Sequence, residues 1–508
     1  MHAKSGSSFA TERSVEKELL LLILFRLFFR KCLNFEREYM GKKRSEQMEG
    51  HSISGESRKN GWVEQKKELT KVLKIAWPAV FESFFISLAG MIDVYMVSGL
   101  GSEAVASVGL TTQPKFLGLS LFFAMNVAIA AIVARRTGEK DKRRANETLA
   151  EAILLTILFG AVITVACVSL AGWLMEKCGS APDTHDGAVI YFQIIMGGMI
   201  FNIISMVINA AQRGAGNTKI AMYTNTISSI VNIIGNYLLI GGHLGFPKLG
   251  IRGAALATVL GTVVGCTISV MSLFRKDSFL SIPYVIKEGL WKRFESVKII
   301  LKLSSSTFVE QILMRIGFMS TAVMAADMGT AAMAAHQVGM NALSLSFSFG
   351  DGMQAAAVAL IGQSLGSKEP QEAKRHGMTC EKVALVMAVF MSMFYLFCGK
   401  WLFGLFFAEA HIVEIGVRIS RILIVIVLFQ ICQVVFTGAL RGAGDVVYTM
   451  ISSTISVTFV RTAVSYICCY IVGWGIYGIW MGIVADQFCR LMLSGIRFRS
   501  GKWMKIKI

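Results

Sequence analysis

The chain has 508 residues, of which 54% are hydrophobic and 17% are charged, and it carries a formal net charge of +18. Long apolar runs separated by short charged connectors exclude an ordinary soluble domain and indicate a polytopic helical membrane protein. Because the excess positive charge lies in those connectors, membrane topology explains it better than nucleic-acid binding, and no nucleic-acid partner is expected.

Ten cysteines are scattered through the chain, most of them inside apolar runs, and no pair shows the CxxC spacing of a zinc site. We interpret them as small apolar packing residues. The sequence also has no Walker A loop, HExxH motif or nucleophile elbow. It therefore argues against an ATP-driven pump and against a membrane-embedded enzyme, and no catalytic residues are expected.

Residues 1–69 differ from the rest of the chain, because they are polar and charged apart from a short apolar run at residues 19–30. That run is too short to cross a bilayer and is interrupted by Arg26. It is either an amphipathic segment lying on a membrane surface or non-native sequence from an upstream start codon, with Met40 or Met48 as the true start. We predict a disordered or loosely attached N-terminal extension over residues 1–69.

From about residue 70 the chain alternates between apolar runs long enough to cross a bilayer and short polar connectors. We divide it into an N-lobe of helices 1–6 (residues 70–276), an inter-lobe linker (277–297), a C-lobe of helices 7–12 (298–498) and a basic tail (499–508). The pattern predicts an all-α membrane protein with twelve transmembrane helices, at 71–97, 105–134, 146–174, 187–211, 219–241, 250–274, 298–326, 332–363, 378–406, 412–438, 447–472 and 476–498.

The connectors alternate in charge. Lys142, Arg143 and Arg144 lie in one of the basic connectors, whereas Glu103 and Asp183 lie in acidic ones on the opposite side. By the positive-inside rule the basic side faces the cytoplasm. An even number of helices then places both termini in the cytoplasm, and we expect a multi-pass protein of the cell membrane, surrounded by the lipid bilayer.

The two halves of the chain repeat one another. The segment RGAG at residues 213–216 returns at residues 441–444, a shift of 228 residues. The same shift relates three further pairs: Glu82 with Glu310, Gly101 with Gly329, and Gly138 with Gly366. Each half has an even number of helices, so both enter the membrane in the same orientation and any cargo site is expected between them. An old duplication kept only for folding would leave the same pattern.

The first predicted helix carries two carboxylates, Glu82 and Asp93, inside a long apolar run. They lie eleven residues apart, close to three helical turns, so they fall on nearly the same face. Charged groups within an apolar span usually face a bundle interior and suggest a functional site. The alternative is that one of them lies at the membrane interface without a function, and this applies more to Glu82, which is nearer the helix end.

The chain resembles the multidrug and toxic compound extrusion (MATE) family of cation-coupled antiporters in several segments, through their sequence, order and spacing. They are Trp77-Pro78 leading to Ile92-Asp93, RGAGNT at 213–218, NIIGN at 232–236, GIRGAALAT at 250–258, AHQ at 335–337 and RGAGD at 441–445. The resemblance implies two pseudo-symmetric six-helix lobes around a central cleft. It also implies a monomeric secondary antiporter in a bacterial plasma membrane, which exports organic, often cationic, amphiphilic drugs in exchange for Na⁺ or H⁺ by alternating access. No cofactor is expected beyond that coupling ion.

The resemblance also assigns roles to individual residues. Asp93 matches the first-helix aspartate linked to cation coupling, and Pro78 matches the proline at which that helix can bend. Asn232, Asn236 and Thr258 match polar residues of the N-lobe cation site. In the C-lobe, Glu310 matches an acid of the sodium-coupled branch, but Gln430 stands where that branch has an aspartate, which argues against a sodium site there.

The residues themselves support a site for a monovalent cation in the N-lobe. Asn232 and Asn236 are four residues apart, so they share one helix face, and Asp93 with Thr258 would add a carboxylate and a hydroxyl. One carboxylate with several neutral oxygens suits a monovalent cation that must also be released, whereas divalent sites usually collect more carboxylates. Hydrogen bonding between helices is the alternative role of the Asn pair. The positions related to the pair by the repeat are Val460 and Val464, so the C-lobe has no copy.

The C-lobe has its own charged residues within predicted helices: Glu310, Arg315, Asp351, Arg461, Asp486 and Arg490. Arg461 requires a carboxylate partner, for which Glu310, Asp351 and Asp486 are the candidates, and Asp486 can pair with Arg490 along one helix. Alternatively, unpaired acids here, including Glu310 and Asp351, attract a cationic drug. His336 is interpreted as a hydrogen-bonded packing residue rather than a proton shuttle.

A flippase for a lipid-linked saccharide is the alternative function on the same fold. Such a cargo would favour a strongly basic central cavity. We expect acid and amide groups in the N-lobe instead, and this argues against the flippase.

Overall fold

The computed structural model describes residues 55–275, 278–292, 294–406 and 409–506. By its contacts the chain divides into two units, residues 1–68 and 69–508, and the helical bundle belongs to the second. The predictions for residues 1–54, including the alternative start sites, lie outside the described residues. The basic C-terminal segment is partly ordered, because the fully buried ring of Trp503 stacks on Phe498 at 4.9 Å.

The described residues form helices and no strand. The first half contains α2 (Gly55–Ser98), α3 (Ser102–Gly138), α4 (Lys142–Ser169), α5 (Ala171–Lys177), α6 (Pro182–Gly197), α7 (Met199–Gly214), α8 (Thr218–Gly241) and α9 (Ile251–Ser272). The connection contains α10 (Ile282–Lys287). The second half contains α11 (Val297–Asp327), α12 (Thr330–Gly366), α13 (Pro370–Phe406), α14 (Ala410–Gly442), α15 (Val446–Ser453), α16 (Thr462–Tyr466) and α17 (Ile476–Ser500), with π-helical turns η3 (Thr454–Arg461) and η4 (Ile467–Ile471) on either side of α16.

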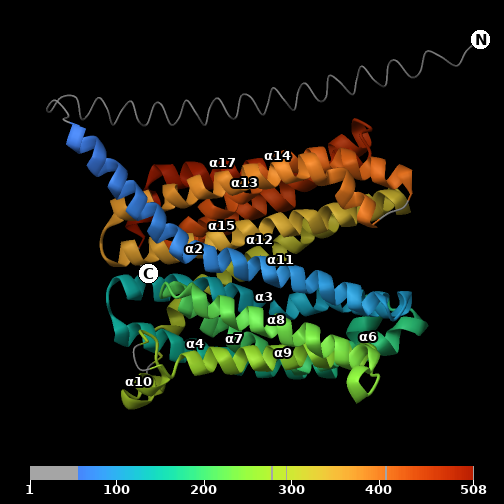
Figure 1. The fold of residues 1–508 in the computed structure, drawn as a ribbon, viewed down its shortest axis with the longest axis horizontal. Helices are drawn as coiled ribbons and strands as arrows, with labels where there is room; N and C mark the ends of the chain where they lie inside the picture. The colour runs from blue at the N-terminus through green and yellow to red at the C-terminus, as the bar shows by residue number, and fades with distance from the viewer. Residues whose placement is uncertain (1–54, 276–277, 293, 407–408, 507–508) are drawn as a thin grey trace, which may run out of the picture. The chain divides into compact units, whose positions relative to one another are not determined.

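In the described part of the chain, nine helices are long and apolar enough to cross a membrane, and the α6–α7 pair, bent by 45°, forms a tenth span. The helices α8 and α12, which are not among these, lie at the remaining two positions predicted from the sequence and bring the number of helices to the twelve expected. The all-α fold with two lobes of six spans each is therefore confirmed. Figure 1 shows α3–α9 gathered on one side and α12–α17 on the other, with α2 and α11 between them.

The sequence repeat is also a repeat of backbone geometry. Three pairs of helices start 228 residues apart: α3 with α12, α4 with α13, and α8 with α15. The turns between them match as well, because Gly216 and Gly444 have φ angles of 85° and 87°. Only glycine adopts this left-handed backbone without strain, which explains why the RGAG segment occurs in both halves.

Each lobe has its own apolar core, but α2 and α11 contribute to both. Val72, Ala76 and Val80, from the first part of α2, belong to the core of the C-lobe. Ile300 and Leu303, at the start of α11, belong to the core of the N-lobe. Since Val72 and Ile300 are related by the 228-residue shift, the two lobes exchange equivalent helix ends.

The connection between the lobes is held against the N-lobe. The amide of Asn146 on α4 donates to the carbonyl of Phe279 at 2.9 Å and accepts from the backbone N–H of Ser281 at 2.7 Å. Val285 of α10 and Leu290 are almost fully buried beside α4. A buried amide with donor and acceptor both satisfied fixes the connection in one position.

Candidate functional site

The candidate site forms where α2 and α8 lie side by side. Three contacts join these helices, and in each the residue numbers differ by 143, so the helices run parallel and in register. The two carboxylates of α2, three turns apart, consequently meet two amides of α8 that are three turns apart. The contacts are Thr218 Oγ1 to the Ile75 carbonyl (2.9 Å), Asn225 Nδ2 to Glu82 (2.7 Å), and Asn236 Nδ2 to Asp93.

The four residues predicted for the cation site come together around the Asp93 carboxylate. Asn236 donates to this carboxylate, and the amide of Asn232 lies between Asp93 and Thr258. With its nitrogen toward Asp93, Asn232 donates at 2.8 Å and accepts from Thr258 Oγ1 at 3.1 Å, an orientation that satisfies both ends of the amide. Asn232 and Asn236 are 7% and 1% exposed, so the site lies inside the N-lobe.

This donor set fits a monovalent cation. Asn236 Oδ1 is buried and has no hydrogen-bond partner among the described residues, so it is an oxygen available to an ion next to a carboxylate. Among the described residues, no group of three or more His, Cys, Asp or Glu side chains is arranged to hold a metal ion. The chemistry is therefore that of one charged oxygen group with neutral oxygens, as Na⁺ binding or reversible protonation requires.

Lys115 of α3 was not among the residues selected from the sequence. It lies near enough to Asp93 for electrostatic attraction, and Tyr191 of α6 is also close to this carboxylate. The N-lobe therefore offers a basic group beside the acid and amide groups expected there. A single lysine within the apolar run 105–134 was the signal available in the sequence.

The other acid of α2 belongs to an ion pair that both lobes share. Glu82 accepts from Arg213 at 2.7 Å, and Glu310 accepts from Arg441 at 2.9 Å. Glu82 is 4% exposed and Glu310 is completely buried, so neither lies on the surface of the helical bundle. Each pair joins the first helix of a lobe to its fourth span, and the 228-residue shift relates one pair to the other.

Asp351 of α12 connects the lobes. Its carboxylate accepts from Ser83 of α2 at 3.1 Å and from Gln354 at 3.4 Å, and it interacts electrostatically with both Arg213 and Arg441. Gln430 of α14 is buried, and its Oε1 has no hydrogen-bond partner in the part of the chain that the structure describes. The three C-lobe candidates therefore differ: Glu310 is paired, Asp351 bridges the lobes and Gln430 is isolated.

The arginine inside the C-lobe has the partner expected for it. Arg461 donates to Asp486 at 2.6 Å, and Arg490 donates to the same carboxylate at 3.0 Å, which confirms both predicted pairs. His336 packs edge-on against Trp480 at 5.5 Å, as expected for a packing residue. Its Nδ1 is buried, and within the described ranges it lacks the hydrogen bond that we expected.

Pro78 lies in α2 where the helix passes from one lobe to the other. Ala76 and Val80, on either side of it, pack in the C-lobe core, whereas Glu82 is bound to the N-lobe. A proline inside a helix removes one backbone hydrogen bond. The helix α2 therefore lacks a backbone hydrogen bond near the point where its contacts pass from the C-lobe to the N-lobe.

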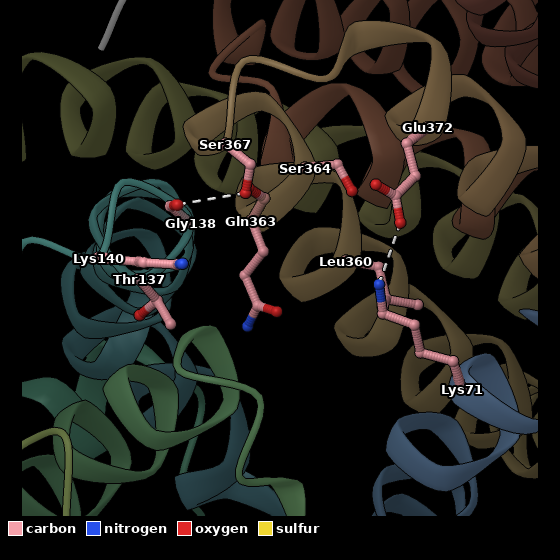
Figure 2. A pocket seen from close by; sticks show the side chains of 9 residues that line it. All are labelled: Lys71, Thr137, Gly138, Lys140, Leu360, Gln363, Ser364, Ser367 and Glu372. Atoms are coloured by element: carbon pink, nitrogen blue, oxygen red, sulfur yellow. Dashed lines mark hydrogen bonds and ion pairs between the residues drawn. The ribbon is translucent and has the colours of Figure 1, made fainter.

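The lobes also meet at the basic side, around a small cavity (Figure 2). Ser367 donates to the carbonyl of Gly138 at 3.2 Å, and Lys71 pairs with Glu372 at 3.2 Å. A Cβ atom on Gly138 would lie 1.9 Å from the Gln363 carbonyl oxygen, so α3 and α12 are in close contact here. The cavity is about 170 Å³, smaller than the ~300 Å³ or more of ordinary ligand pockets, so it is a gap in the closed contact rather than a cargo site.

Comparison with known proteins gives consistent matches. The MatE family model matches residues 78–238 and 307–467. The probable multidrug resistance protein NorM of Thermotoga maritima is 28% identical over 447 residues, 87% of this chain and 94% of that protein. Two solved structures are each 22% identical to this chain. An outward-facing multidrug resistance MATE family transporter of the MOP superfamily has a TM-score of 0.79 over 86% of this chain and 97% of its own. A MOP superfamily transporter from Pyrococcus furiosus, described as having a binding pocket of reverse polarity that suggests a different function, has a TM-score of 0.80 over 87% and 97%.

The solved structures are too distant in sequence to support more than the fold, and they agree with the two lobes described above. The family model matches one segment in each lobe, and the two segments together cover more than half of the chain. The family consists of transporters, which confirms that the chain is not an enzyme. The chain belongs to the MatE family, the multidrug and toxic compound extrusion transporters.

Proposed function

We propose that the protein is a secondary antiporter that exports amphiphilic organic compounds, in exchange for Na⁺ or H⁺ bound at Asp93. The observation that carries the proposal is the Asp93 carboxylate, held by Asn232 and Asn236 inside one lobe and without a counterpart in the other. A charge retained within a transmembrane helix at this cost suggests that it serves the transport cycle.

The site can bind and release a cation by small rotations of its amides. Both amide nitrogens point toward Asp93, and a turn of either side chain would present its oxygen instead. Asn236 Oδ1, which has no partner, would become an ion ligand, together with Thr258 Oγ1. Protonation of Asp93 would require no ligand oxygens, and an ion-gradient experiment distinguishes these two possibilities.

Ion binding at Asp93 is coupled to the rest of the transport cycle through α2. Asp93 lies fifteen residues after Pro78 on the same helix, and the segment before Pro78 packs in the other lobe. A cation that draws Asp93, Asn232 and Asn236 together pulls on the second half of α2, and bending at Pro78 lets that half move while the first half stays in place. A ligand shifts a conformational equilibrium only if it prefers one state, and this arrangement provides such a preference.

The basic side is proposed to be cytoplasmic by the positive-inside rule, with both termini on that side of the plasma membrane. The contacts of Gly138, Ser367 and Lys71 then close the cytoplasmic side, so alternating access would require them to separate. In the C-lobe, Glu310 forms the ion pair with Arg441. Asp351 accepts from Ser83 of α2, so this contact would change when the lobes move relative to one another. Gln430 has no charge and takes no part in ion binding.

The test is transport by the purified full-length protein in liposomes, with a sodium gradient or a proton gradient imposed separately. Ethidium, which is a cation, and a rhodamine with a free carboxylate, which is a zwitterion, serve as reporters. Export of either dye that depends on one of the gradients supports the antiporter and identifies the ion. If neither gradient moves either dye, the proposal is wrong.

A further inference from the structure

Two cationic side chains meet at the boundary between the lobes, on one aromatic ring. Arg315 of α11 lies over the ring of Phe116 of α3, with its Cζ 4.8 Å from the ring centroid. Lys115 lies beside the same ring, with its Nζ 5.8 Å from the centroid. Because α3 belongs to the N-lobe and α11 to the C-lobe, this is a contact across the molecule. All three side chains are half-buried.

Both cations lie near the middle of transmembrane helices. Lys115 is thirteen residues after the start of α3, and Arg315 is twelve residues before the end of α11, so each is several turns from a polar end. A cation at such a depth faces the protein interior or a wet cavity and normally has an acidic partner.

Neither cation has a carboxylate within ion-pair distance in the part of the chain that the structure describes. Asp93 attracts Lys115 from further away, and its oxygens already accept from Asn232 and Asn236. The arginines within the two lobes behave differently, because Arg213, Arg441 and Arg461 each lie against a carboxylate.

The ring of Phe116 does not replace such a partner. A cation–π contact returns only part of the cost of removing a cation from water. The structure therefore places two positive charges on one ring where α3 meets α11, and neither forms an ion pair among the described residues. An anionic group of a ligand would supply a counter-charge, because Arg and Lys are the side chains that bind carboxylate and phosphate, and an aromatic ring beside them suits an apolar body.

We propose that Lys115, Arg315 and Phe116 form a cargo subsite for the acidic head of an amphiphile, a carboxylate or a phosphate, so that the preferred cargo is acidic rather than a simple organic cation. This inference rests on the proposed export function and specifies its cargo. The apolar body of the cargo packs on Phe116, and its acidic group lies between the two cations. An organic cation lacking an acid would be repelled by the same pair.

The test compares a rhodamine that has a free carboxylate with the methyl ester of the same dye, which lacks the negative charge and is larger by one methyl group. Binding to the full-length protein in lipid nanodiscs is measured by fluorescence anisotropy. The acid is expected to bind about tenfold or more tightly than the ester, as a charge-assisted contact implies. Lys115→Gln and Arg315→Gln should each reduce this preference by about tenfold. Lys302→Gln removes an exposed lysine of α11 and should leave the preference unchanged.

If these substitutions prevent folding, the inference is tested on the wild-type protein instead. The acid dye should protect Lys115 of the wild-type protein from acetylation by acetic anhydride, as measured by mass spectrometry, and the ester should not. A second arm identifies a lipid source of the same chemistry. In liposomes, the protein is tested for faster translocation of fluorescent phosphatidylglycerol than of phosphatidylcholine, by dithionite quenching.

A preference for the acid dye that depends on Lys115 and Arg315 supports a soluble acidic cargo. Faster translocation of phosphatidylglycerol that depends on the same residues supports an acidic lipid. Equal handling of acid and ester, together with equal handling of the two lipids, overturns the inference, as does a preference that survives both substitutions. Transport of either dye by an ion gradient would still be observed in that case, so failure here is distinct from failure of the antiporter proposal.

Discussion

The two lobes share the same arrangement of helices, but the polar residues buried within them differ. Each has a buried Glu–Arg pair between its first helix and its fourth span, and each has the same positive-φ glycine turn after that span. Where the N-lobe has Asp93 against Asn236, the C-lobe has Thr321 and Val464. The C-lobe instead places Arg461 against Asp486.

The first helices of the lobes differ in the same way. In α2, Pro78 and Asp93 lie on one helix, whereas the positions related to them in α11 are Ser306 and Thr321. The point of bending and the carboxylate therefore occur together and only in the N-lobe. Features kept in both lobes meet a packing requirement that both share, and features found in one lobe are the better candidates for the transport cycle.

The largest difference between the lobes is expected at Asp93. Asp93→Asn keeps the size and the hydrogen bonds of the side chain but removes the charge that binds a cation, and it also lowers the cost of burial. Gradient-driven export by liposomes should fall to the level of empty liposomes, with normal amounts of folded protein. Thr321→Val, at the related position of the C-lobe, should transport at the wild-type rate. Export by Asp93→Asn at that rate would remove Asp93 from the mechanism.

A large effect of a different kind is expected at Arg461. Arg461→Ala leaves the buried Asp486 with Arg490 as its remaining ionic partner, and breaking a buried ion pair in this way costs about 3–5 kcal/mol. The yield of monodisperse protein and the melting temperature in detergent should therefore fall. Ile233→Ala, at the related N-lobe position, should lower stability much less. Normal expression of Arg461→Ala with loss of ion coupling would assign Arg461 to the transport cycle instead.

Equal effects are expected at Gly138 and Gly366, which are related by the repeat. A Cβ atom would lie 1.9 Å from the Gln363 carbonyl oxygen in one case and 2.1 Å from the Arg135 carbonyl oxygen in the other. Gly138→Ala and Gly366→Ala should each disfavour the closed basic side by about 1–3 kcal/mol, as overpacking does. Faster hydrogen exchange at residues 135–140 and 363–368 would report the opening. Gly90→Ala, where a Cβ meets open space, is the control. Unequal effects would mean that the two helices do not contribute equally to the gate.

The smallest effect is expected at Asn236. Asn236→Ala removes one amide from the proposed ion site and should raise the half-saturating cation concentration by roughly five- to tenfold, as the loss of about one hydrogen-bond equivalent implies. Gln430→Ala, in the C-lobe, should change that value by less than about twofold, because a neutral isolated amide contributes little. Transport measured over a range of cation concentrations tests both, and similar shifts would place part of the ion site in the C-lobe.

Much of the architecture followed from the sequence. Twelve spans, the helical class and the 228-residue repeat are visible in hydropathy and spacing, because a membrane helix must satisfy its backbone within itself and present about twenty apolar residues. The residues around Asp93 were selected from the resemblance to the family, and the spacing of four between Asn232 and Asn236 supported the choice, since it places them on one helix face. The pairing of Asp486 with Arg490 follows from the same local rule.

The choice of partners across helices was decided by the tertiary structure. Periodicity states which face of a helix a residue occupies, but it does not state which of several helices that face meets. For this reason Glu310 could not be assigned to Arg441 from the sequence, nor Asp351 to Ser83. Lys115 and Arg315 are 200 residues apart and on different lobes, and only the packing of α3 against α11 brings both to the ring of Phe116.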